Sequence, residues 1–404
     1  FINSVPSCAS PFGIPVKTEL RILGYYFNSR GIAVSSWMRI HQRSIPVLRE
    51  LKGLVLPLTC KARLAASWFL SKYWYHGTIS LPPRQIFLTV TRIAFQFVWG
   101  NSVEWVSRAR LYQSREVGGL RVPHVKVKCL ALGIKAIFDA LSEPNHPAHD
   151  LLHYFLGPEI RFFCSFQQNR PRSEFTAPHL KEYVSSVRRL RESHVDADLS
   201  TWSVRRFYVS LLGLLPAPTG VPELSVPRQI AWRYATAGWL DSRRASLQWR
   251  LAHDVLPLRD RLHRYGLTSP RCPFCSSHET AQHAFHECLV PDVLWHRVEE
   301  LYGVPRIRWG TIQTLLQPPV PIRDRRQFIL LAVEINYQVW IARCIAVHGG
   351  RARGTSHVLS LVRAGVRRVL QRERAVLGAM EFGRRWLTSS VLFEETHGRY
   401  VVHY

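Results

Sequence analysis

One stretch of the sequence combines three thiols and an imidazole at short intervals: Cys272-Pro273-Phe274-Cys275-Ser276-Ser277-His278-Glu279-Thr280-Ala281-Gln282-His283-Ala284-Phe285-His286-Glu287-Cys288. Two, seven and four residues separate Cys272, Cys275, His283 and Cys288. A Cys-x2-Cys turn can present both sulfurs to one metal ion, and a following His and Cys can complete a tetrahedron. Four protein ligands leave no open position for a substrate. The stretch therefore predicts a structural zinc site.

Two further histidines of this stretch leave the nitrogen ligand open. His278 or His286 could replace His283, although His286 would leave only one residue before Cys288. The simpler alternative is that buried thiols and surface imidazoles lie near one another by chance. A Cys-x-x-Cys pair in a chain without a secretory signal favours a metal over a disulfide. The remaining cysteines are scattered and are interpreted as ordinary buried thiols: Cys8, Cys60, Cys129, Cys164 and Cys344.

The overall charge predicts a polyanionic partner. Among 404 residues, 54 are Lys or Arg and 28 are Asp or Glu, which gives a formal net charge of +26. Nucleic acid is the first candidate and an anionic membrane surface the second. The length suggests two or three domains, and 47% apolar residues suffice for real cores. The most apolar run, from Phe328 to Ala342, is interrupted by Glu334, Asn336 and Gln338, so we expect a buried helix and no membrane partner.

Apolar periodicity predicts a mainly helical protein. Expected helices span about 39–54, 61–75, 84–99, 125–141, 325–347 and 356–377, and another begins near Pro291. An apolar strand, Leu20–Phe27, precedes a turn and predicts a short N-terminal β-hairpin. Gly118-Gly119 predicts a tight reversal. Residues 142–227 carry nine prolines and are interpreted as an irregular connector.

Two groups of basic residues are candidate nucleic-acid contacts. The first lies on two consecutive predicted helices and the second on the last one, and they comprise Arg39, Arg43, Lys61, Arg63 and Lys72, and Arg363, Arg367 and Arg368. Cations on a helix can follow a phosphate backbone, but a charged run is more often a solvated face. The last helix also has an apolar face, so a membrane-surface helix is its alternative.

The order of these features resembles the C-terminal part of the reverse transcriptase polyprotein of LINE-type (non-LTR) retrotransposons. The most specific likeness is Trp249-Arg250-Leu251, then Leu256-Pro257, and then Cys-x2-Cys-x7-His-x4-Cys with Glu279-Thr280 before the histidine. Trp340-Ile341-Ala342-Arg343 is similar to the segment that follows that family's zinc region. Ile22-Leu23-Gly24, Leu81-Pro82, Phe97-Val98-Trp99 and Gly118-Gly119-Leu120 resemble upstream segments of the family.

The resemblance implies a division of the chain. Residues 1–36 would end the polymerase palm with its primer-grip hairpin, 37–141 would form a helical thumb, and 142–227 the connector. Residues 228–348 would form a helical domain carrying the CCHC zinc site, and 349–404 a basic helix and tail. The likeness covers about residues 15–145 and 228–348. RNA, DNA and the upstream palm and fingers of the same polyprotein would be partners, in the nucleus and cytoplasm.

Catalytic carboxylates are missing from the sequence. The family's polymerase needs an aromatic-x-Asp-Asp turn and an upstream Asp to hold two metal ions, and no Asp-Asp pair occurs here. Asp196 and Asp198 come nearest, in polar surroundings that favour a solvated loop. We therefore expect no catalytic residue in this chain, and Mg²⁺ only in a palm outside it. The start at Phe1, without Met, predicts a C-terminal fragment.

Other interpretations remain open. An endonuclease beyond the zinc region would need spaced carboxylates and a lysine, and the acids that follow the loop lie in helical settings without a nearby lysine: Asp292, Glu299, Glu300, Asp324 and Glu334. A protein of another class, a non-enzymatic zinc-containing interaction protein or a degenerate or co-opted element remnant, would show the same zinc motif.

Overall fold

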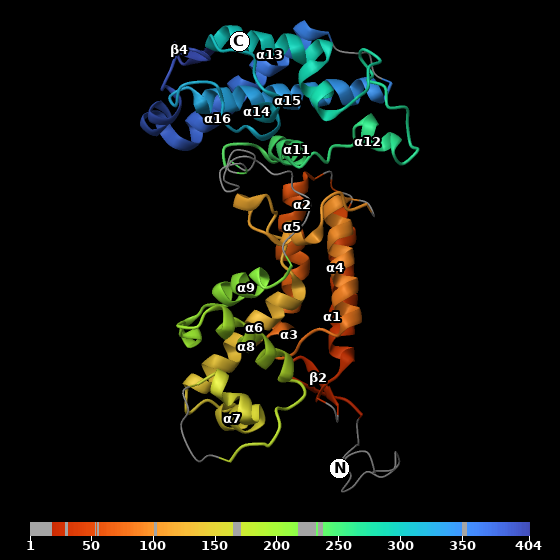
Figure 1. Cartoon of the computed structure of the whole chain (residues 1–404), viewed down its shortest axis with the longest axis vertical. Helices are drawn as coiled ribbons and strands as arrows, with labels where there is room; N and C mark the ends of the chain where they lie inside the picture. Colours follow the sequence, from red (N-terminus) through yellow and green to blue (C-terminus); the bar gives the residue numbers. More distant parts are fainter. Residues whose placement is uncertain are drawn as a thin grey trace. The chain divides into compact units, whose positions relative to one another are not determined.

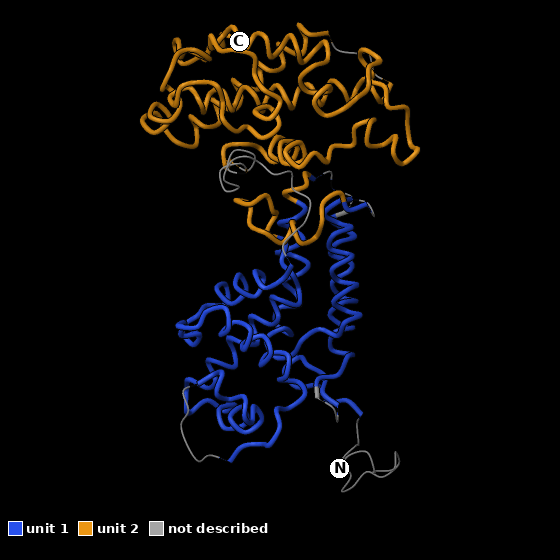
Figure 2. The backbone as a smooth tube through the Cα atoms, viewed as in Figure 1, with its two compact units in different colours: residues 1–56, 61–104, 122–218 blue, residues 57–60, 105–121, 219–404 orange. Residues whose placement is uncertain are grey.

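The computed structural model describes residues 18–28, 31–52, 54, 56–100, 103–164, 171–216, 232, 237–349 and 354–404. The described chain is mainly helical, with short antiparallel strands near each end and the Cys/His cluster among its C-terminal helices, as the sequence predicts (Figure 1). It divides into two compact units (Figure 2). Unit 1 comprises residues 1–56, 61–104 and 122–218, and unit 2 comprises 57–60, 105–121 and 219–404.

The N-terminal sheet has three strands, β1 (Leu20–Ile22), β2 (Tyr25–Asn28) and β3 (Gly31–Ile32), paired antiparallel in that order. The strand expected to run unbroken from Leu20 to Phe27 is interrupted because Leu23 and Gly24 form a turn, with φ angles of 48° and 89°. Two consecutive positive φ angles suit the tight turn of a hairpin. Ser29 and Arg30, within the predicted turn, lie outside the described residues.

The helices that follow belong to unit 1, except for Leu58 to Cys60, which belong to unit 2. They are α1 (Val34–Lys52), α2 (Leu58–Leu64), the π-turn η3 (Ala65–Phe69), the 3-10 turn η4 (Leu70–Tyr73), α3 (Trp74–Gly77), α4 (Arg84–Trp99) and α6 (Val125–Ser142). The bounds of α4 match the prediction, and its apolar stripe buries Ile86, Val90, Ala94, Phe97 and Val98. Figure 1 shows α1 and α4 side by side.

The region interpreted as an irregular connector is more helical than its prolines suggest. It contains α7 (His149–Leu156), η6 (Gly157–Phe162), α8 (Lys181–Ser193), η7 (Leu199–Thr201) and α9 (Val204–Gly213). Among the described prolines, Pro158 lies in the first turn of η6 and the others fall between elements. Helix α8 buries Tyr183, Val184, Val187 and Leu190 at helical spacing. Helices α7, α8 and α9 all contact α6. Residues 217–227 lie outside the described part.

Unit 2 is organised around one long helix, α15 (Arg325–Val347), which matches its predicted bounds. The elements that contact it include α11 (Ser242–Ala252), the π-turn η8 (His283–Glu287), α13 (Leu289–Tyr302) and α16 (Thr355–Trp386). The unit also contains α5 (Arg108–Tyr112), η5 (Arg115–Val117), α12 (Arg259–His263) and α14 (Trp309–Thr314). Among the described residues α15 alone is long and apolar enough to cross a membrane, and 72% of its most apolar window is buried in this core.

The polar residues of α15 have partners inside unit 2. Glu334 is fully buried and accepts two bonds from Arg244, at 2.5 Å to Nε and 2.6 Å to Nη2. Asn336 donates to the side chain of Gln248 at 3.0 Å. A buried charge is tolerated when it is paired and hydrogen-bonded. The residues that interrupt the apolar run are therefore cross-links between helices.

The predicted Gly-Gly reversal lies within unit 2. Gly118 has a φ of 84°, and its carbonyl accepts bonds from Trp249 Nε1 at 3.0 Å and His253 Nε2 at 2.8 Å. A Cβ at Gly118 would lie 2.5 Å from the Trp232 ring. Both the backbone angle and the close ring require glycine here. This packing draws residues 105–121 into the unit that carries the Cys/His cluster.

The C-terminus ends in structure that the sequence analysis does not predict. Helix α16 is interrupted at Gly378, where φ is 74°, one residue beyond the predicted end of the helix. Strands β4 (Phe393–Thr396) and β5 (Arg399–Val402) form a hairpin, and Tyr404 donates its hydroxyl to Leu294 O at 2.9 Å. Tyr404 is almost fully buried, so the last residue belongs to the core of unit 2.

Candidate metal centre

A tight turn presents the first two thiols. The N–H of Cys272 donates to Ser277 O at 2.6 Å, and Arg271 and His278 form an antiparallel bridge across the base of the turn. Within it, Ser276 N–H donates to Cys272 O at 3.1 Å, and Ser276 has a φ of 62°. Phe274 N–H donates to Cys272 Sγ at 3.4 Å. The Cys-x2-Cys segment thus forms a hydrogen-bonded knuckle that positions both sulfurs.

The π-turn η8 brings the other two side chains to the same place. In an α-helix, residues five apart lie about 140° apart around the axis, so His283 and Cys288 would diverge. Here the N–H of Cys288 donates to His283 O at 2.9 Å, an i to i+5 bond that widens the turn. The wider turn brings the side chains of His283 and Cys288 to the same side of the helix. Both can therefore contribute ligand atoms to one metal site, although four residues separate them.

The ligand atoms of Cys272, Cys275, His283 and Cys288 all lie within 4.8 Å of one another. Cys288 Sγ lies 3.7 Å from Cys272 Sγ and 3.7 Å from Cys275 Sγ. A tetrahedral zinc with Zn–S bonds of about 2.3 Å requires sulfurs about 3.8 Å apart. The Cys275 Sγ to His283 Nε2 distance, 3.1 Å, is somewhat shorter than the roughly 3.5 Å of a filled site. The donor set therefore fits zinc in kind and spacing.

Of the three candidate imidazoles, His283 is the one that joins the thiols. His278 is exposed and bonds through Nε2 to Asp260 Oδ1 at 2.8 Å. His286 is buried, and neither of its ring nitrogens has a partner in the described structure. The geometry thus groups the four residues selected from the sequence and leaves both alternatives outside the cluster.

The thiols are electrostatically coupled. A hydrogen bond from Cys288, with the N–H groups of Phe274 and Cys275, lowers the pKa of Cys272 to about 5. The same contact raises the pKa of Cys288, which keeps its proton beside a thiolate. A cation between the sulfurs would offset the repulsion between neighbouring thiolates, because a bound metal favours the thiolate form of each ligand. This donor chemistry is suited to a metal ion.

Glu279 anchors the knuckle to the helical core. Its carboxylate is fully buried and pairs with Arg343 of α15, at 2.7 Å to Nη2 and 3.1 Å to Nε. It also accepts the N–H of Arg259, at the start of α12, at 2.7 Å. The Trp340 ring lies near the Arg343 guanidinium and parallel to Phe285 of η8. Two segments noted separately in the sequence are thus joined by one buried ion pair.

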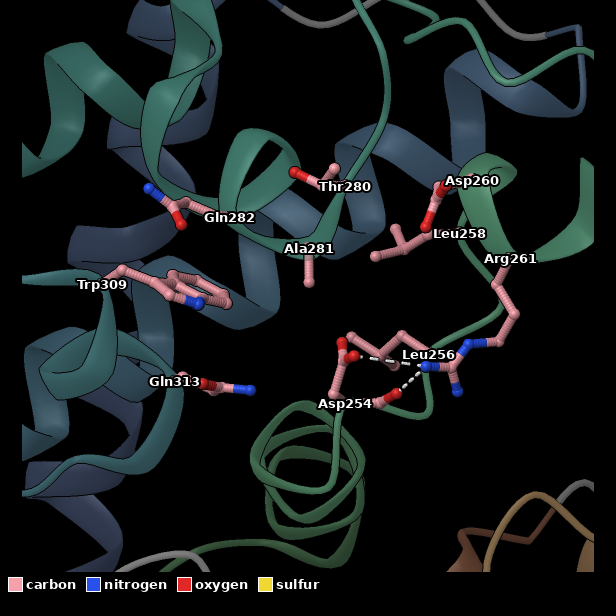
Figure 3. Close-up of a pocket in the computed structure, with 10 residues that line it drawn as sticks. All are labelled: Asp254, Leu256, Leu258, Asp260, Arg261, Thr280, Ala281, Gln282, Trp309 and Gln313. Atoms are coloured by element: carbon pink, nitrogen blue, oxygen red, sulfur yellow. Dashed lines mark hydrogen bonds and ion pairs between the residues drawn. The ribbon is translucent and has the colours of Figure 1, made fainter. Parts of the chain in front are cut away.

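A pocket of about 340 Å³ lies beside the loop (Figure 3). The loop lines it with Thr280, Ala281 and Gln282, and α14 lines it with Trp309 and Gln313. Its two carboxylates already have partners in the described structure: Asp254 pairs with Arg261, and Asp260 pairs with Arg264 and His278. The pocket is therefore poorly suited to a second metal ion.

The carboxylates that follow the loop do not cluster, and each one contacts its own neighbouring residues. Asp292 pairs with Arg306 at 2.7 Å, Glu299 accepts Ile307 N–H at 2.8 Å, and Glu300 lies 3.4 Å from His296. Asp198 accepts two bonds from Ser200 in a cap. Within the described ranges, no second group of three or more Cys, His, Asp or Glu side chains is close enough to hold a metal ion.

The candidate nucleic-acid contacts fall into two kinds. In unit 1, Arg39, Arg43, Arg63 and Lys72 are exposed and Lys61 is partly buried. The four exposed cations have no carboxylate partner in the part of the chain that the structure describes, although Arg39 stacks on Tyr26. In unit 2, Arg363 and Arg367 donate to the carbonyls of Tyr404 and Tyr400, so both hold the C-terminal hairpin, and Arg368 is exposed.

Sequence reasoning missed the anchoring role of Glu279 and Arg343. Both residues belong to recognisable motifs, but those motifs are separate in the sequence. A fully buried carboxylate cannot be recognised from local spacing when its partner is 64 positions away. The signal that could have found the pair is an acid four residues before the ligand histidine together with an arginine in a mostly apolar helix.

Residues 226–295 match the family of zinc-binding regions in reverse transcriptases. The match supports a reverse-transcriptase-related protein. It includes all four residues of the Cys/His cluster, the α11 segment with Trp249, and α12. No curated protein matches the chain. Together, the matched region and the Cys3His geometry support zinc binding at this loop.

Proposed function

We propose that this chain is the nucleic-acid-binding C-terminal part of a LINE-type retrotransposon reverse transcriptase. Unit 1 would contain the end of the palm and the thumb, and unit 2 the zinc-bearing domain. The chain would grip RNA template and DNA target during target-primed reverse transcription. Its sequence has no Asp-Asp pair, so catalysis would reside in a palm and fingers outside it, where Mg²⁺ would act. Its partners would be RNA, DNA and those upstream domains, in the nucleus and cytoplasm.

The observation that carries this proposal is the reverse-transcriptase zinc region built around an intact Cys3His cluster. The excess of cations supports the choice of partner, because a net charge of +26 attracts a polyanion. Arg43, Arg63 and Lys72 are exposed without carboxylate partners among the described residues, and therefore free to contact phosphates. A cation already paired within the protein would have less to gain from a phosphate.

Zinc would have a structural role. Cys272, Cys275, His283 and Cys288 would hold it, and four protein ligands leave no site for a reacting water. When bound, it would cross-link the knuckle to the start of α13. Glu279 and Arg343 then fix the knuckle on α15, so that the loop surface keeps one shape.

Salt dependence of binding tests the electrostatic part of the proposal. The whole chain is titrated with a structured RNA at several salt concentrations, and the logarithm of the association constant should fall linearly with the logarithm of the salt concentration. Replacing two unpaired cations, Arg43→Gln with Lys72→Gln, should weaken binding and reduce the slope by about 0.9 for each duplex phosphate that the variant no longer neutralises.

The matched control removes two cations that already have a partner. Arg384 and Arg385 both pair with Glu381, so Arg384→Gln with Arg385→Gln should leave the slope nearly unchanged. Equal effects of the two double variants would show that net charge alone is responsible. A wild-type chain whose affinity does not depend on salt would exclude the proposal and favour a zinc-containing interaction protein.

A further inference from the structure

The side chain of Trp68 projects into solvent, although Phe69 and Leu70, which follow it in the same helical run, are buried. Sequence periodicity groups it with Leu64, Ala65 and Phe69 on one face, and Ala65 and Phe69 are fully buried, yet Trp68 is 58% exposed. Trp68 lies within η3, where an i to i+5 bond joins Leu70 N–H to Ala65 O. This π-turn changes the rotation along the helix, and such turns are frequent at functional sites.

Trp68 has no aromatic or cationic partner in the described structure. Exposed cations flank it along the chain: Arg63 lies five residues before it and Lys72 four residues after it. Neither cation has a carboxylate partner among the described residues. Charge and aromatic surface therefore alternate along one exposed stretch of unit 1.

A second exposed aromatic continues this stretch. Tyr75 is 56% exposed, and its hydroxyl donates to Leu23 O at 2.9 Å. Its ring also lies against Tyr25, with centroids 4.9 Å apart. The N-terminal hairpin thus holds the ring in place and leaves much of it accessible. A ring held before binding loses little conformational freedom when a ligand stacks on it.

We propose that Trp68 and Tyr75 form a stacking platform for the bases of single-stranded nucleic acid, with Arg63 and Lys72 contacting its phosphates. The inference rests on the proposed nucleic-acid function and deepens it, because it names unpaired strands as a ligand. Stacking on aromatic rings beside a basic track is the usual way in which proteins hold single strands without reading their sequence. A protein partner is disfavoured by the cations on both sides of the indole.

The test uses the whole chain and two labelled probes of about 20 nucleotides, longer than a typical single-strand binding site. One probe is oligothymidylate, and the other is an abasic strand of equal length, which keeps the phosphates and lacks the bases. Affinities are measured by fluorescence anisotropy for the wild type, Trp68→Ala, Trp68→Phe and a control, Phe175→Ala. Phe175 is an exposed aromatic of the same unit, 76% accessible, that follows the acidic Glu174.

Trp68→Ala should weaken oligothymidylate binding by between about five-fold and a hundred-fold. It should leave abasic-strand binding within about two-fold of the wild type, since phosphate contacts do not need the indole. Trp68→Phe should recover most of the loss, and Phe175→Ala should bind both probes as the wild type does. Circular dichroism should be unchanged for all variants, because Trp68 packs little surface.

The outcomes separate this inference from the proposed function. If the wild type binds neither probe nor structured RNA, the proposed function fails and the platform fails with it. If the wild type binds but Trp68→Ala binds oligothymidylate equally well, only the platform is wrong. Equal losses on both probes would also overturn it, because the loss would then not come from the bases.

Discussion

At the scale of single residues, the Cys/His cluster depends on which imidazole faces the sulfurs. Spacing alone leaves three histidines as candidates, and the i to i+5 bond of η8 turns His283 toward Cys275. His286 follows three residues later and is buried away from the thiols, without a hydrogen-bond partner in the described structure. Local backbone geometry therefore determines which histidine joins the thiols, a question that residue types and spacing leave open.

Zinc content should distinguish the two histidines. The purified wild type should contain about one zinc per chain, because four closed ligands form one structural site. His283→Ala should weaken zinc binding at least ten-fold, and His286→Ala should leave it near the wild-type value. Cys272→Ser with Cys275→Ser should abolish it. Elemental analysis and chelator competition measure these outcomes, and loss of zinc in His286→Ala alone would contradict the assignment.

Gly365 in α16 should be intolerant of any side chain. A Cβ there would lie 1.9 Å from Glu334 Oε1, inside the buried ion pair with Arg244. Gly365→Ala should lower the free energy of unfolding by about 2 kcal/mol, because overpacking outweighs the helix-propensity gain of alanine. Gly383→Ala is the matched control in the same helix, since its nearest neighbour would be 3.9 Å away. Urea denaturation should show the control unchanged or stabilised.

At the scale of elements, helices are held in place by buried polar pairs that join distant segments. Glu279 of the knuckle pairs with Arg343 of α15, and Arg244 of α11 pairs with Glu334 of the same helix. Each guanidinium also lies over an aromatic ring, Trp340 or Tyr337. Such pairs add specificity of packing more than net stability, because desolvation offsets much of their attraction.

Breaking the Glu279–Arg343 pair from one side should be costly. Glu279→Gln leaves Arg343 buried without its counter-charge, and Arg343→Met leaves Glu279 alone, so each should lower the free energy of unfolding by about 3 kcal/mol. The double variant should lose less than the sum, because neither charge then remains unpaired. Chemical denaturation of all four proteins in saturating zinc gives the cycle, and strictly additive losses would show that the pair does not act as a unit.

His124, which caps α6, should make unit 1 sensitive to acid. Burial lowers the pKa of His124 to about 4, and its Nδ1 accepts Val127 N–H only when the ring is neutral. Because the folded pKa lies below the unfolded value, the contribution is complete above about pH 6.5 and is lost as the pH falls through 4. We expect a loss on the order of 2–3 kcal/mol across that window.

His124→Asn provides the control for this pH dependence. Asparagine is a good N-cap that does not titrate, so the variant should keep the capping bond and lose the acid-sensitive component. Urea denaturation between pH 4 and pH 8 should show the wild type losing stability relative to the variant as the pH falls. Parallel pH profiles would indicate that His124 is not the group responsible.

At the scale of the whole molecule, most of the candidate nucleic-acid contacts and the metal cluster lie in different units. Among the candidate contacts that are exposed and have no carboxylate partner in the described ranges, Arg39, Arg43, Arg63 and Lys72 lie in unit 1. Arg368 lies in unit 2, which also holds the Cys/His cluster. Each unit has its own buried core. Loss of metal should therefore act first on the packing of one unit.

Chelation of zinc should loosen unit 2 and leave the core of unit 1 intact. Without metal, the close thiols of the knuckle repel or must hold protons, so peptides covering residues 270–290 should lose hydrogen-exchange protection. Peptides from α4 and α6 should keep theirs. Hydrogen-exchange mass spectrometry before and after chelation measures both regions, and an equal loss in α6 would show that the two units unfold together.

The amino-acid pattern was sufficient for several features because their causes are local. Apolar periodicity defined α4 and α15, and the intervals within 272–288 selected the four residues that the structure brings together as candidate metal ligands. Other features depend on contacts that no local window contains. The anchoring of Glu279 by Arg343, the place of Gly118 beneath Trp249, and the burial of Tyr404 join residues 64, 131 and 110 positions from their partners. Trp68 likewise lies in a π-turn, whose i to i+5 hydrogen bond changes the rotation along the helix. Sequence alone determined which residue types could bind metal and nucleic acid, and tertiary packing decided which of them face one another, because burial and hydrogen bonding are satisfied across the whole fold.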